Sequence, residues 1–486
     1  MDLAQLRKPP EIFDREAEWA ELAAFVCNDR PGATLGVVAG PPRQGKSALL
    51  EALTAECGGF YFAAQEGAES ESLRRLADDL ARHTGSTEPP RLTRWGEALD
   101  ALFALGERQP LPVVLDGFPH LVRQCPALPS VLLNAYGRPH QPRERSRTRL
   151  LLCGSARSVM GRVFGSTSPL HGVAGLSLTV HPLDFRQAAR LWGVTDPGLA
   201  VELHAVLGGS AAYRHDYVCD DTPSAPDDLD AWICRTVLNP RMPLFHEATH
   251  LLEEEPGLPD RAVCHSTLAA VASGAATRGE IAERLGLRLE DVTHALAQLQ
   301  DCGLLTCEPN AFHPRRERLR ITEPLLAFEH AVLRPHRSQL ERQPPAEVWP
   351  QLRPVFDAAV VGPHFARLCR DWALGYASTS TFPGIATSAL PGAVADLAVD
   401  VAVRGEAGGR PAALLSVGTA RWAEPLDLPD LEGLHRVLEI LTARGEDTSR
   451  TLPACYGAAG FSPGLRTAAS RGEVLLVDLD RLYHGS

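Results

Sequence analysis

Two glycines, a lysine and a serine in residues 40–47 have the spacing of a phosphate-binding loop. The stretch GPPRQGKS matches the pattern G-x-x-x-x-G-K-[ST], with Gly40, Gly45, Lys46 and Ser47 at the defining positions. The glycines let backbone N–H groups curve around phosphate oxygens, and the lysine ammonium reaches the β- and γ-phosphates. Of the 48 Lys+Arg residues, only Lys8 and Lys46 are lysines. A guanidinium fits this space poorly, so we interpret Lys46 as a position constrained by chemistry.

The loop pattern predicts a site for ATP and Mg²⁺. Residues expected to contact the nucleotide are Gly40, Pro41, Pro42, Arg43, Gln44, Gly45, Lys46 and Ser47. Asp116 ends an apolar run, at the strand end where α/β proteins bind ligands. We expect Ser47 and Asp116 to hold Mg²⁺, with Asp116 acting through water. Ser155 ends a further apolar run and is expected to sense the γ-phosphate.

Alternating strands and helices are needed to position these residues. Apolar runs predict buried strands at residues 35–39, 112–115 and 149–155, and amphipathic patterns predict helices over residues 70–83 and 95–107. Strands that alternate with helices favour an α/β fold with a doubly wound parallel sheet. The strand, the loop and the helix around residues 34–50 match the context that a phosphate loop requires.

Composition limits the class of protein. A chain of 486 residues is too long for one core, and 44% hydrophobic with 22% charged residues is ordinary for a globular protein. A net charge of −12 argues against a chain-wide surface for polyanions. Eleven cysteines without a C-x-x-C pair indicate reduced thiols rather than a disulfide framework or a zinc site. No run of about 18 apolar residues is present, so we expect a cytoplasmic protein without membrane contact.

Several stretches resemble the archaeal-type P-loop ATPases as they occur in actinobacteria, a branch of the AAA+/STAND-like NTPases. The stretches lie at residues 15–18, 40–47, 61–80, 113–122, 150–160 and 168–193, and the resemblance covers nearly the whole chain. It implies an ATPase domain with a helical lid at residues 1–245, a winged helix-turn-helix at 246–325, and a restriction-endonuclease-like α/β domain at 326–486. It also implies that Arg15 belongs to the nucleotide site.

Two departures from this family indicate slow hydrolysis. The family places a glutamate after the strand aspartate to orient the attacking water, whereas this chain has Gly117. Loss of a general base typically costs about 10²–10⁴ in rate. The family arginine near the γ-phosphate is replaced by Val173, and such an arginine can contribute about 10³–10⁵. We therefore expect ATP binding with weak hydrolysis, unless His120 or Arg157 substitutes.

Residues 264–305 have a helix-turn-helix pattern. Apolar positions expected inside are Ile281, Ala282, Leu285, Val292, Leu296 and Leu299, with Gly286 at the turn. The outward positions of the second helix hold no cation, and they are Glu290, Asp291, His294, Gln298 and Asp301. The following wing carries Arg315, Arg316, Arg318 and Arg320. DNA binding depends largely on cations that meet phosphates, so a wing-only DNA contact and a docking role both remain open.

The last third shows a helix at residues 362–374 and strands at 396–403 and 412–418. A nuclease of the resembled fold needs an aspartate on one strand and an acidic residue with a lysine on the next. Asp400 matches the first position, but Thr419 and Arg421 occupy the second motif, and Ala366 replaces a frequent glutamate. A hydroxyl is a poor substitute for a carboxylate on a hard cation, and arginine stays protonated. We expect this degenerate domain not to cleave nucleic acid.

Three functions follow from these expectations. The first is a slow NTPase whose nucleotide state acts as a regulatory switch, with DNA as one partner. The second is an active ATPase that remodels a protein partner and has a relocated base. The third is an interaction scaffold that nucleotide stabilises and that does not hydrolyse it.

Overall fold

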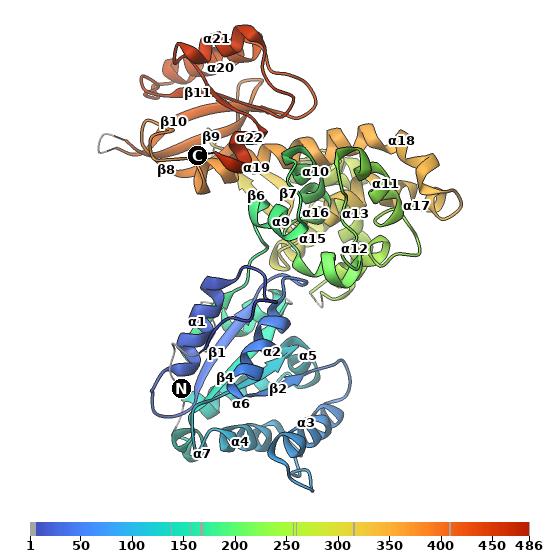
Figure 1. The fold of residues 1–486 in the computed structure, drawn as a ribbon, viewed down its shortest axis with the longest axis vertical. Helices are drawn as coiled ribbons and strands as arrows, with labels where there is room; N and C mark the ends of the chain where they lie inside the picture. Colours follow the sequence, from blue (N-terminus) through green and yellow to red (C-terminus); the bar gives the residue numbers. More distant parts are fainter. Residues whose placement is uncertain are drawn as a thin grey trace. The chain divides into compact units, whose positions relative to one another are not determined.

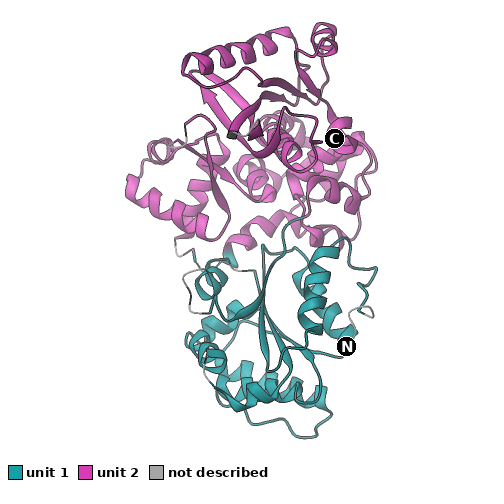
Figure 2. Ribbon diagram, turned by 90° about the vertical axis from the view of Figure 1, so that its left-hand side faces the viewer, with its two compact units in different colours: residues 1–182, 253–257 teal, residues 183–252, 258–486 magenta. Residues whose placement is uncertain are grey.

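The computed structural model describes residues 6–137, 139–155, 157–165, 168, 170–255, 257–258, 260–313, 316–407 and 410–485. The chain forms two compact units, residues 1–182 with 253–257 and residues 183–252 with 258–486 (Figure 2). Each unit has its own five-stranded β-sheet with apolar clusters packed against it. Among the described helices, none is long and apolar enough to cross a membrane.

Five parallel strands form the sheet of the first unit (Figure 1). They are β1 (Thr34–Ala39), β2 (Phe60–Ala63), β3 (Leu111–Asp116), β4 (Thr148–Gly154) and β5 (Ala174–Thr179). Their order is β2-β3-β4-β1-β5, and each neighbouring pair is parallel. Ala39 pairs with Gly154, so the carboxyl ends of β1 and β4 lie together at one edge of the sheet.

Side chains of these strands alternate between two apolar cores. In β1, Leu35 and Val37 belong to one core and Val38 to the other. In β3, Leu115 joins the first core and Val114 joins the second. Burial on both faces explains why the strands are continuous apolar runs in the sequence. The predicted doubly wound parallel sheet is therefore confirmed.

Helices cover both faces of this sheet (Figure 1). The face with Val38 packs against α1 (Glu16–Cys27) and α2 (Lys46–Cys57). The other face is covered by α3 (Glu69–Thr84), α4 (Trp95–Leu105), α5 (Phe118–Gln124), α6 (Leu128–Gly137) and α8 (Arg157–Phe164). The short α7 (Gln141–Arg145) precedes β4. The loop that joins β1 to α2 thus lies at the carboxyl end of an inner strand.

The second unit begins with helices. They are α9 (Phe185–Trp192), α10 (Pro197–Leu207), α11 (Leu229–Arg235) and α12 (Leu244–Glu253), with short helical turns at residues 213–217 and 226–228. Asp184 caps α9 by accepting hydrogen bonds from the backbone N–H groups of Arg186 and Gln187, each at 2.9 Å. It also accepts one from the Tyr376 hydroxyl at 2.6 Å, which connects this cap to a residue 192 positions later in the second unit.

Three helices and an antiparallel hairpin follow in the second unit. They are α13 (Arg261–Ala272), α14 (Arg278–Leu285), α15 (Leu289–Asp301), β6 (Leu305–Pro309) and β7 (Glu317–Ile321). Gly286 ends α14 with a φ of 63°, which turns the chain into α15. Ile281, Val292, Leu296 and Leu299 are buried, while Ala282 and Leu285 are half-buried. The winged-helix assignment of this segment stays a prediction.

A mixed five-stranded sheet occupies the C-terminal part. Four helices and two π-helical turns (residues 329–333 and 357–361) precede it, and the helices are α16 (Pro324–Phe328), α17 (Arg334–Leu340), α18 (Pro345–Phe356) and α19 (Gly362–Gly375). The strands are β8 (Ile385–Val394), β9 (Leu397–Ala407), β10 (Arg410–Arg421), β11 (Leu452–Gly457) and β12 (Leu475–Val477), in the order β12-β11-β10-β9-β8. The remaining helices are α20 (Leu428–Ala443), α21 (Pro463–Ser470) and α22 (Leu479–His484). The endonuclease-like assignment of this α/β part also stays a prediction.

Candidate functional site

The loop between β1 and α2 has the backbone shape that its glycines allow. Gly40 has a φ of 147°, and a Cβ atom there would lie 2.2 Å from the backbone carbonyl oxygen of Val180, just after β5. Gly45 caps the N-terminus of α2 with a φ of 80°. Side chains at either position would strain this backbone. Gln44 is buried, and its Nε2 donates to the carbonyl of Pro42 over 3.1 Å.

Lys46 begins α2 and is only 6% exposed. Its Nζ donates to the carbonyl oxygens of Gly40, over 3.1 Å, and of Pro41. Burial lowers the pKa of Lys46, and the nearby Cys153 and Asp116 act in the opposite direction. The ammonium therefore lies inside the loop and points at main-chain oxygens that line it. Phosphate oxygens would offer it stronger, charged acceptors in the same place.

Asp116 lies at the carboxyl end of β3 and contacts a residue that the sequence analysis missed. The Tyr61 hydroxyl donates to Asp116 Oδ2 over 2.6 Å, and the backbone N–H of Gly117 donates to Oδ1 over 2.8 Å. Tyr61 pairs with Val114, and residues two apart on a strand face the same side, so Tyr61 and Asp116 both face α2. Ser47, in the first turn of α2, is a further hydrogen-bonding neighbour of Tyr61.

The surroundings of Tyr61 keep its hydroxyl protonated, so the hydroxyl donates a hydrogen bond. Burial raises the pKa of Tyr61, and the hydrogen bond to the Asp116 carboxylate raises it further. Burial likewise raises the pKa of Cys153, which lies on β4 on the other side of Asp116. A neutral hydroxyl and a neutral thiol therefore flank the one carboxylate that was predicted to hold Mg²⁺.

Ser155 and Arg15 were both predicted to belong to the nucleotide site. Ser155 is half-buried and follows Gly154, the register partner of Ala39, so it lies at the same sheet edge as Gly40. Arg15 is buried, and its Nη2 donates to the carbonyl of Gln44 over 3.3 Å. Its Nη1 pairs with Glu18 over 2.9 Å. The side chain of Arg15 thus contacts the backbone of the loop.

A segment from residues 253–257 also reaches the loop within the first unit. Arg43 Nη2 pairs with Glu254 Oε1 over 2.7 Å, and the Ser158 hydroxyl donates to Glu255 over 3.3 Å. Arg43 has a φ of 64°, an uncommon conformation for a residue with a side chain. This loop residue, with its uncommon backbone conformation, is therefore held by an ion pair with a residue more than 200 positions later.

Gly117 adopts a left-handed conformation with a φ of 70°. A Cβ atom there would lie 2.8 Å from the carbonyl oxygen of Ala64 and 3.3 Å from Cδ2 of His120. A glutamate at position 117 would therefore need a different local backbone. Of the two residues proposed to replace the missing base, His120 lies beside Gly117. Its buried Nδ1 has no hydrogen-bond partner among the described residues. Arg157 is exposed at the start of α8.

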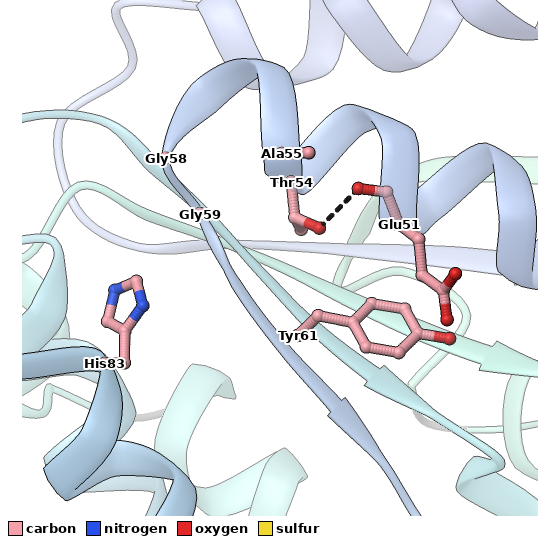
Figure 3. Close-up of a pocket in the computed structure, with 7 residues that line it drawn as sticks. All are labelled: Glu51, Thr54, Ala55, Gly58, Gly59, Tyr61 and His83. Carbon is pink, nitrogen blue, oxygen red and sulfur yellow. Dashed lines mark hydrogen bonds between the residues drawn. The ribbon is translucent and has the colours of Figure 1, made fainter.

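An open pocket of about 370 Å³ lies beside Tyr61 (Figure 3), and none of residues 40–47 lines it. Its lining residues are Glu51, Thr54, Ala55, Gly58, Gly59, Tyr61 and His83. Figure 3 shows the Glu51 carboxylate at the hydroxyl end of Tyr61. The ring of Tyr61 thus lines the pocket while its hydroxyl bonds Asp116.

The predicted wing arginines differ in their surroundings. Arg315 lies outside the described residues, and Arg316 and Arg318 are exposed. Arg320 instead pairs with Glu308 of β6 at 2.5 Å, and Arg370 of α19 reaches the same carboxylate at 3.6 Å. Arg320 is therefore engaged within the second unit, which leaves Arg316 and Arg318 as the described exposed cations of this set.

The connection between β6 and β7 contacts the C-terminal sheet. The backbone N–H of Ala311 donates to the carbonyl of Pro391 in β8 over 3.0 Å. Arg404 of β9 donates to the carbonyl of Ala311 over 3.4 Å. The ring of Phe312 lies against Gly392, where a Cβ atom would be 2.7 Å from it. Glycine at this position in β8 therefore permits the close packing.

The candidate nuclease residues bond one another or neighbouring helices. Asp400 Oδ2 accepts from the backbone N–H of Ala420 over 2.8 Å and from the Thr419 hydroxyl over 3.3 Å. Arg421 pairs with Asp430 of α20 at 2.5 Å. The ring of Trp422 lies 5.7 Å from that of Phe365 in α19, so it packs within the domain. In the part of the chain that the structure describes, no group of three or more His, Cys, Asp or Glu residues could hold a metal ion.

Comparisons with known proteins give distant structural likenesses only. No family model matches the chain, and no curated protein matches it. Among solved structures, the Walker-type ATPase PABY2304 of Pyrococcus abyssi is 20% identical, with a TM-score of 0.48, and covers 68% of this chain and 100% of its own. The ORC2 protein of Aeropyrum pernix is 17% identical, with a TM-score of 0.40 and coverages of 73% and 97%. Cdc6p of Pyrobaculum aerophilum is 15% identical, with a TM-score of 0.34 and coverages of 70% and 99%.

Likenesses with TM-scores below 0.5 carry no activity to this chain. The class instead follows from the geometry of the first unit. A parallel sheet with helices on both faces bears a glycine-rich loop between an inner strand and a helix, with a buried lysine at the helix start. This is the fold of a P-loop NTPase.

Proposed function

We propose that this protein binds ATP with Mg²⁺ at residues 40–47, hydrolyses it slowly, and uses its nucleotide state as a switch. The observation that carries the proposal is the buried Lys46, whose ammonium is held inside a loop that closes back on the start of α2. Burying an unpaired ammonium is unfavourable unless it serves a ligand or a strong partner. Triphosphate oxygens are the charged acceptors that match this position.

The residues present fit the nucleotide. Gly40 lets the loop pass close to the backbone of Val180, where a Cβ atom would clash, and the N-terminus of α2 points its N–H groups at the same loop. Ser47 and Asp116 supply one hydroxyl and one carboxylate oxygen for Mg²⁺ and its waters. When bound, Mg²⁺ would neutralise charge on the phosphates. Ser155, at the same sheet edge, is the proposed γ-phosphate sensor.

Slow hydrolysis is supported by the surroundings of Asp116. Gly117 has no side chain, and its left-handed backbone leaves little space for one. Val173 is uncharged and packs against the apolar core, so it cannot act as an arginine would at the γ-phosphate. The competing function, an active ATPase that remodels a partner, would use His120 as a relocated base, because it lies beside Gly117 and has a buried ring nitrogen without a partner among the described residues.

The second unit is the proposed output of the switch. We assign α13 to α15 with β6 and β7 as a winged helix, and the C-terminal α/β part as a non-cleaving endonuclease-like domain. The contacts of Ala311 with Pro391 and Arg404 favour docking of the wing on that domain. A DNA contact through Arg316 and Arg318 is the alternative that a binding assay decides.

Binding and turnover of ATP should be measured on the same purified sample. We expect saturable Mg²⁺-dependent binding by calorimetry and a turnover below about 1 per second, the lower end of typical enzyme rates. Turnover at about 1–10³ per second would favour the remodelling ATPase. Binding with no turnover would favour the scaffold, and no binding would refute the proposal.

A salt series with duplex DNA tests the output. An association constant whose logarithm falls linearly with the logarithm of salt concentration, with a smaller slope in the Arg316→Ala, Arg318→Ala double variant, would support the DNA contact. No measurable binding at low salt is what the docking assignment predicts.

A further inference from the structure

Tyr61 occupies the position between the two proposed Mg²⁺ ligands, and nothing in the loop pattern requires it there. Its hydroxyl donates to Asp116 Oδ2 over 2.6 Å and has the Ser47 side chain as a further hydrogen-bonding neighbour. The ring packs under α2 in the apolar core on that face of the sheet. The hydroxyl therefore connects the strand aspartate to the first turn of the helix.

We propose that Tyr61 is a positioning residue whose hydroxyl competes with Mg²⁺ for Asp116 and Ser47 and so raises the Mg²⁺ concentration needed for nucleotide binding. This inference rests on the proposed ATP site. Mg²⁺ keeps a rigid octahedral shell, and its bound waters donate to carboxylate oxygens. A phenol that already donates to Oδ2 competes for that lone pair, so the bond must open before the metal and its waters occupy the space.

Glu51 provides a second acceptor for the released hydroxyl. It lies four residues after Ser47 on α2, hence on the same side of the helix. Its side chain is exposed, and its carboxylate lies at the hydroxyl end of Tyr61 (Figure 3). The tyrosine can thus exchange Asp116 for Glu51 without losing a charged acceptor. This exchange of acceptors is reversible, because the hydroxyl keeps a hydrogen bond in both arrangements.

The test is the Mg²⁺ dependence of nucleotide affinity in the full chain. ADP and ATP are titrated calorimetrically into wild type and Tyr61→Phe, first in EDTA and then over a series of Mg²⁺ concentrations. We expect Tyr61→Phe to lower the Mg²⁺ concentration at half effect about tenfold, which corresponds to about 1.4 kcal/mol. Affinity in EDTA should be unchanged, because the phosphate cradle is intact.

Two controls separate this role from packing. Tyr136→Phe removes another buried hydroxyl from the same unit, one that donates to the carbonyl of Thr34 over 3.5 Å, and should leave the Mg²⁺ midpoint unchanged. In an Asp116→Asn background, Tyr61→Phe should have no further effect on the midpoint, since the metal ligand is absent. A purely structural tyrosine would shift stability in both backgrounds and leave the midpoint alone.

Glu51→Gln tests the same exchange of acceptors in a chain that retains Tyr61. It weakens the second acceptor at an exposed site, so folding should be unaffected and the Mg²⁺ midpoint should rise. An unchanged or higher midpoint in Tyr61→Phe would overturn the inference while leaving nucleotide binding established. Absence of nucleotide binding by wild type at every Mg²⁺ concentration would overturn the proposed function, and this inference with it.

Discussion

The ammonium of Lys46 donates a hydrogen bond to the backbone carbonyl of Gly40 at 3.1 Å, so the lysine side chain connects the two ends of the loop. The bond joins the first residue of α2 to the first residue of the loop, six positions earlier. Nucleotide would have to replace carbonyl acceptors with phosphate oxygens, which bear more charge and bind an ammonium more strongly. Binding should therefore open this contact while leaving the helix start in place.

Lys46→Met should abolish stabilisation by nucleotide. Wild type is expected to gain about 2.7 kcal/mol at a nucleotide concentration of 100 times Kd, and the variant should gain nothing, because the charged donor is lost. Thermal unfolding with and without ATP and Mg²⁺ measures both. Lys46→Arg should fail as well, since a planar guanidinium does not fit the buried position.

Lys8, the other lysine of the chain, supplies the matched control. It donates to the carbonyl of Ile12 and pairs with Glu16 at 3.4 Å, with no part in the loop. Lys8→Arg should keep the full nucleotide shift. Retention of the shift in Lys46→Met would place the nucleotide elsewhere.

Substitution of Gly117 should destabilise the first unit rather than restore hydrolysis. We expect Gly117→Ala and Gly117→Glu each to cost about 1–3 kcal/mol, because the φ of 70° and the carbonyl of Ala64 at 2.8 Å both oppose a side chain. Denaturant unfolding and ATP turnover measure the two effects. Gly96→Ala is the control, because Gly96 lies in α4 with open space at its Cβ position, where alanine is neutral or stabilises by up to about 1 kcal/mol. Faster turnover in Gly117→Glu without a loss of stability would contradict this expectation.

Arg353 of α18 should be important for the stability of the second unit. It pairs with Glu202 of α10, with Asp230 of α11 at 2.7 Å and with Asp357 at 3.1 Å. Arg353→Ala would leave three carboxylates without their shared cation. We expect a loss of about 1–3 kcal/mol, because only the carboxylate of Glu202 is largely buried, whereas those of Asp230 and Asp357 keep contact with solvent. Arg235→Ala is the control, because its two carboxylate pairs are on the surface and should contribute less than about 1 kcal/mol.

The effect of Arg353→Ala should depend on pH in a defined direction. Burial raises the pKa of Glu202 to about 7, against an ordinary value of 4.5. The folded state therefore binds this proton more tightly than the unfolded state. The resulting stabilisation is complete below about pH 4.5 and is lost as the pH rises through about 7. Without Arg353 the carboxyl resists ionisation more, so the variant should lose more stability at pH 8 than at pH 5 in parallel unfolding curves.

The C-terminal domain should not cleave DNA or RNA in Mg²⁺ or Mn²⁺. Asp400 is bonded to Ala420 and Thr419, so its role is local. Asp400→Ala should lower stability by about 1–3 kcal/mol, since the backbone N–H of Ala420 loses its acceptor. Gel assays with single- and double-stranded substrates provide the measurement. Cleavage that disappears in Asp400→Ala would refute the assignment, and cleavage that persists would indicate a contaminant.

The parts of this fold that depend on local pattern could be predicted. Strands expected at residues 35–39, 112–115 and 149–155 occur at Thr34–Ala39, Leu111–Asp116 and Thr148–Gly154, because buried strands with glycine or proline at their ends are distinct in sequence. Helices at residues 70–83 and 95–107 were placed to within two residues at each end.

Features that depend on pairing could not be predicted. The contact of Tyr61 with Asp116 follows from the register of β2 on β3, which no local pattern specifies. The absence of a carboxylate at Gly117 is visible in the sequence, but its left-handed backbone is not. Arg320 belongs to a cationic run in the sequence, and only the fold shows that Glu308 neutralises it.

The ion pair between Arg43 and Glu254 sets a limit on how the chain can be divided. Residues 253–257 belong to the first unit, yet they are continuous on both sides with helices of the second. A fragment that ends at residue 182 would contain every residue of the phosphate loop and still lack the carboxylates that bond Arg43 and Ser158. A fragment meant to keep both bonds would therefore have to include residues 253–257.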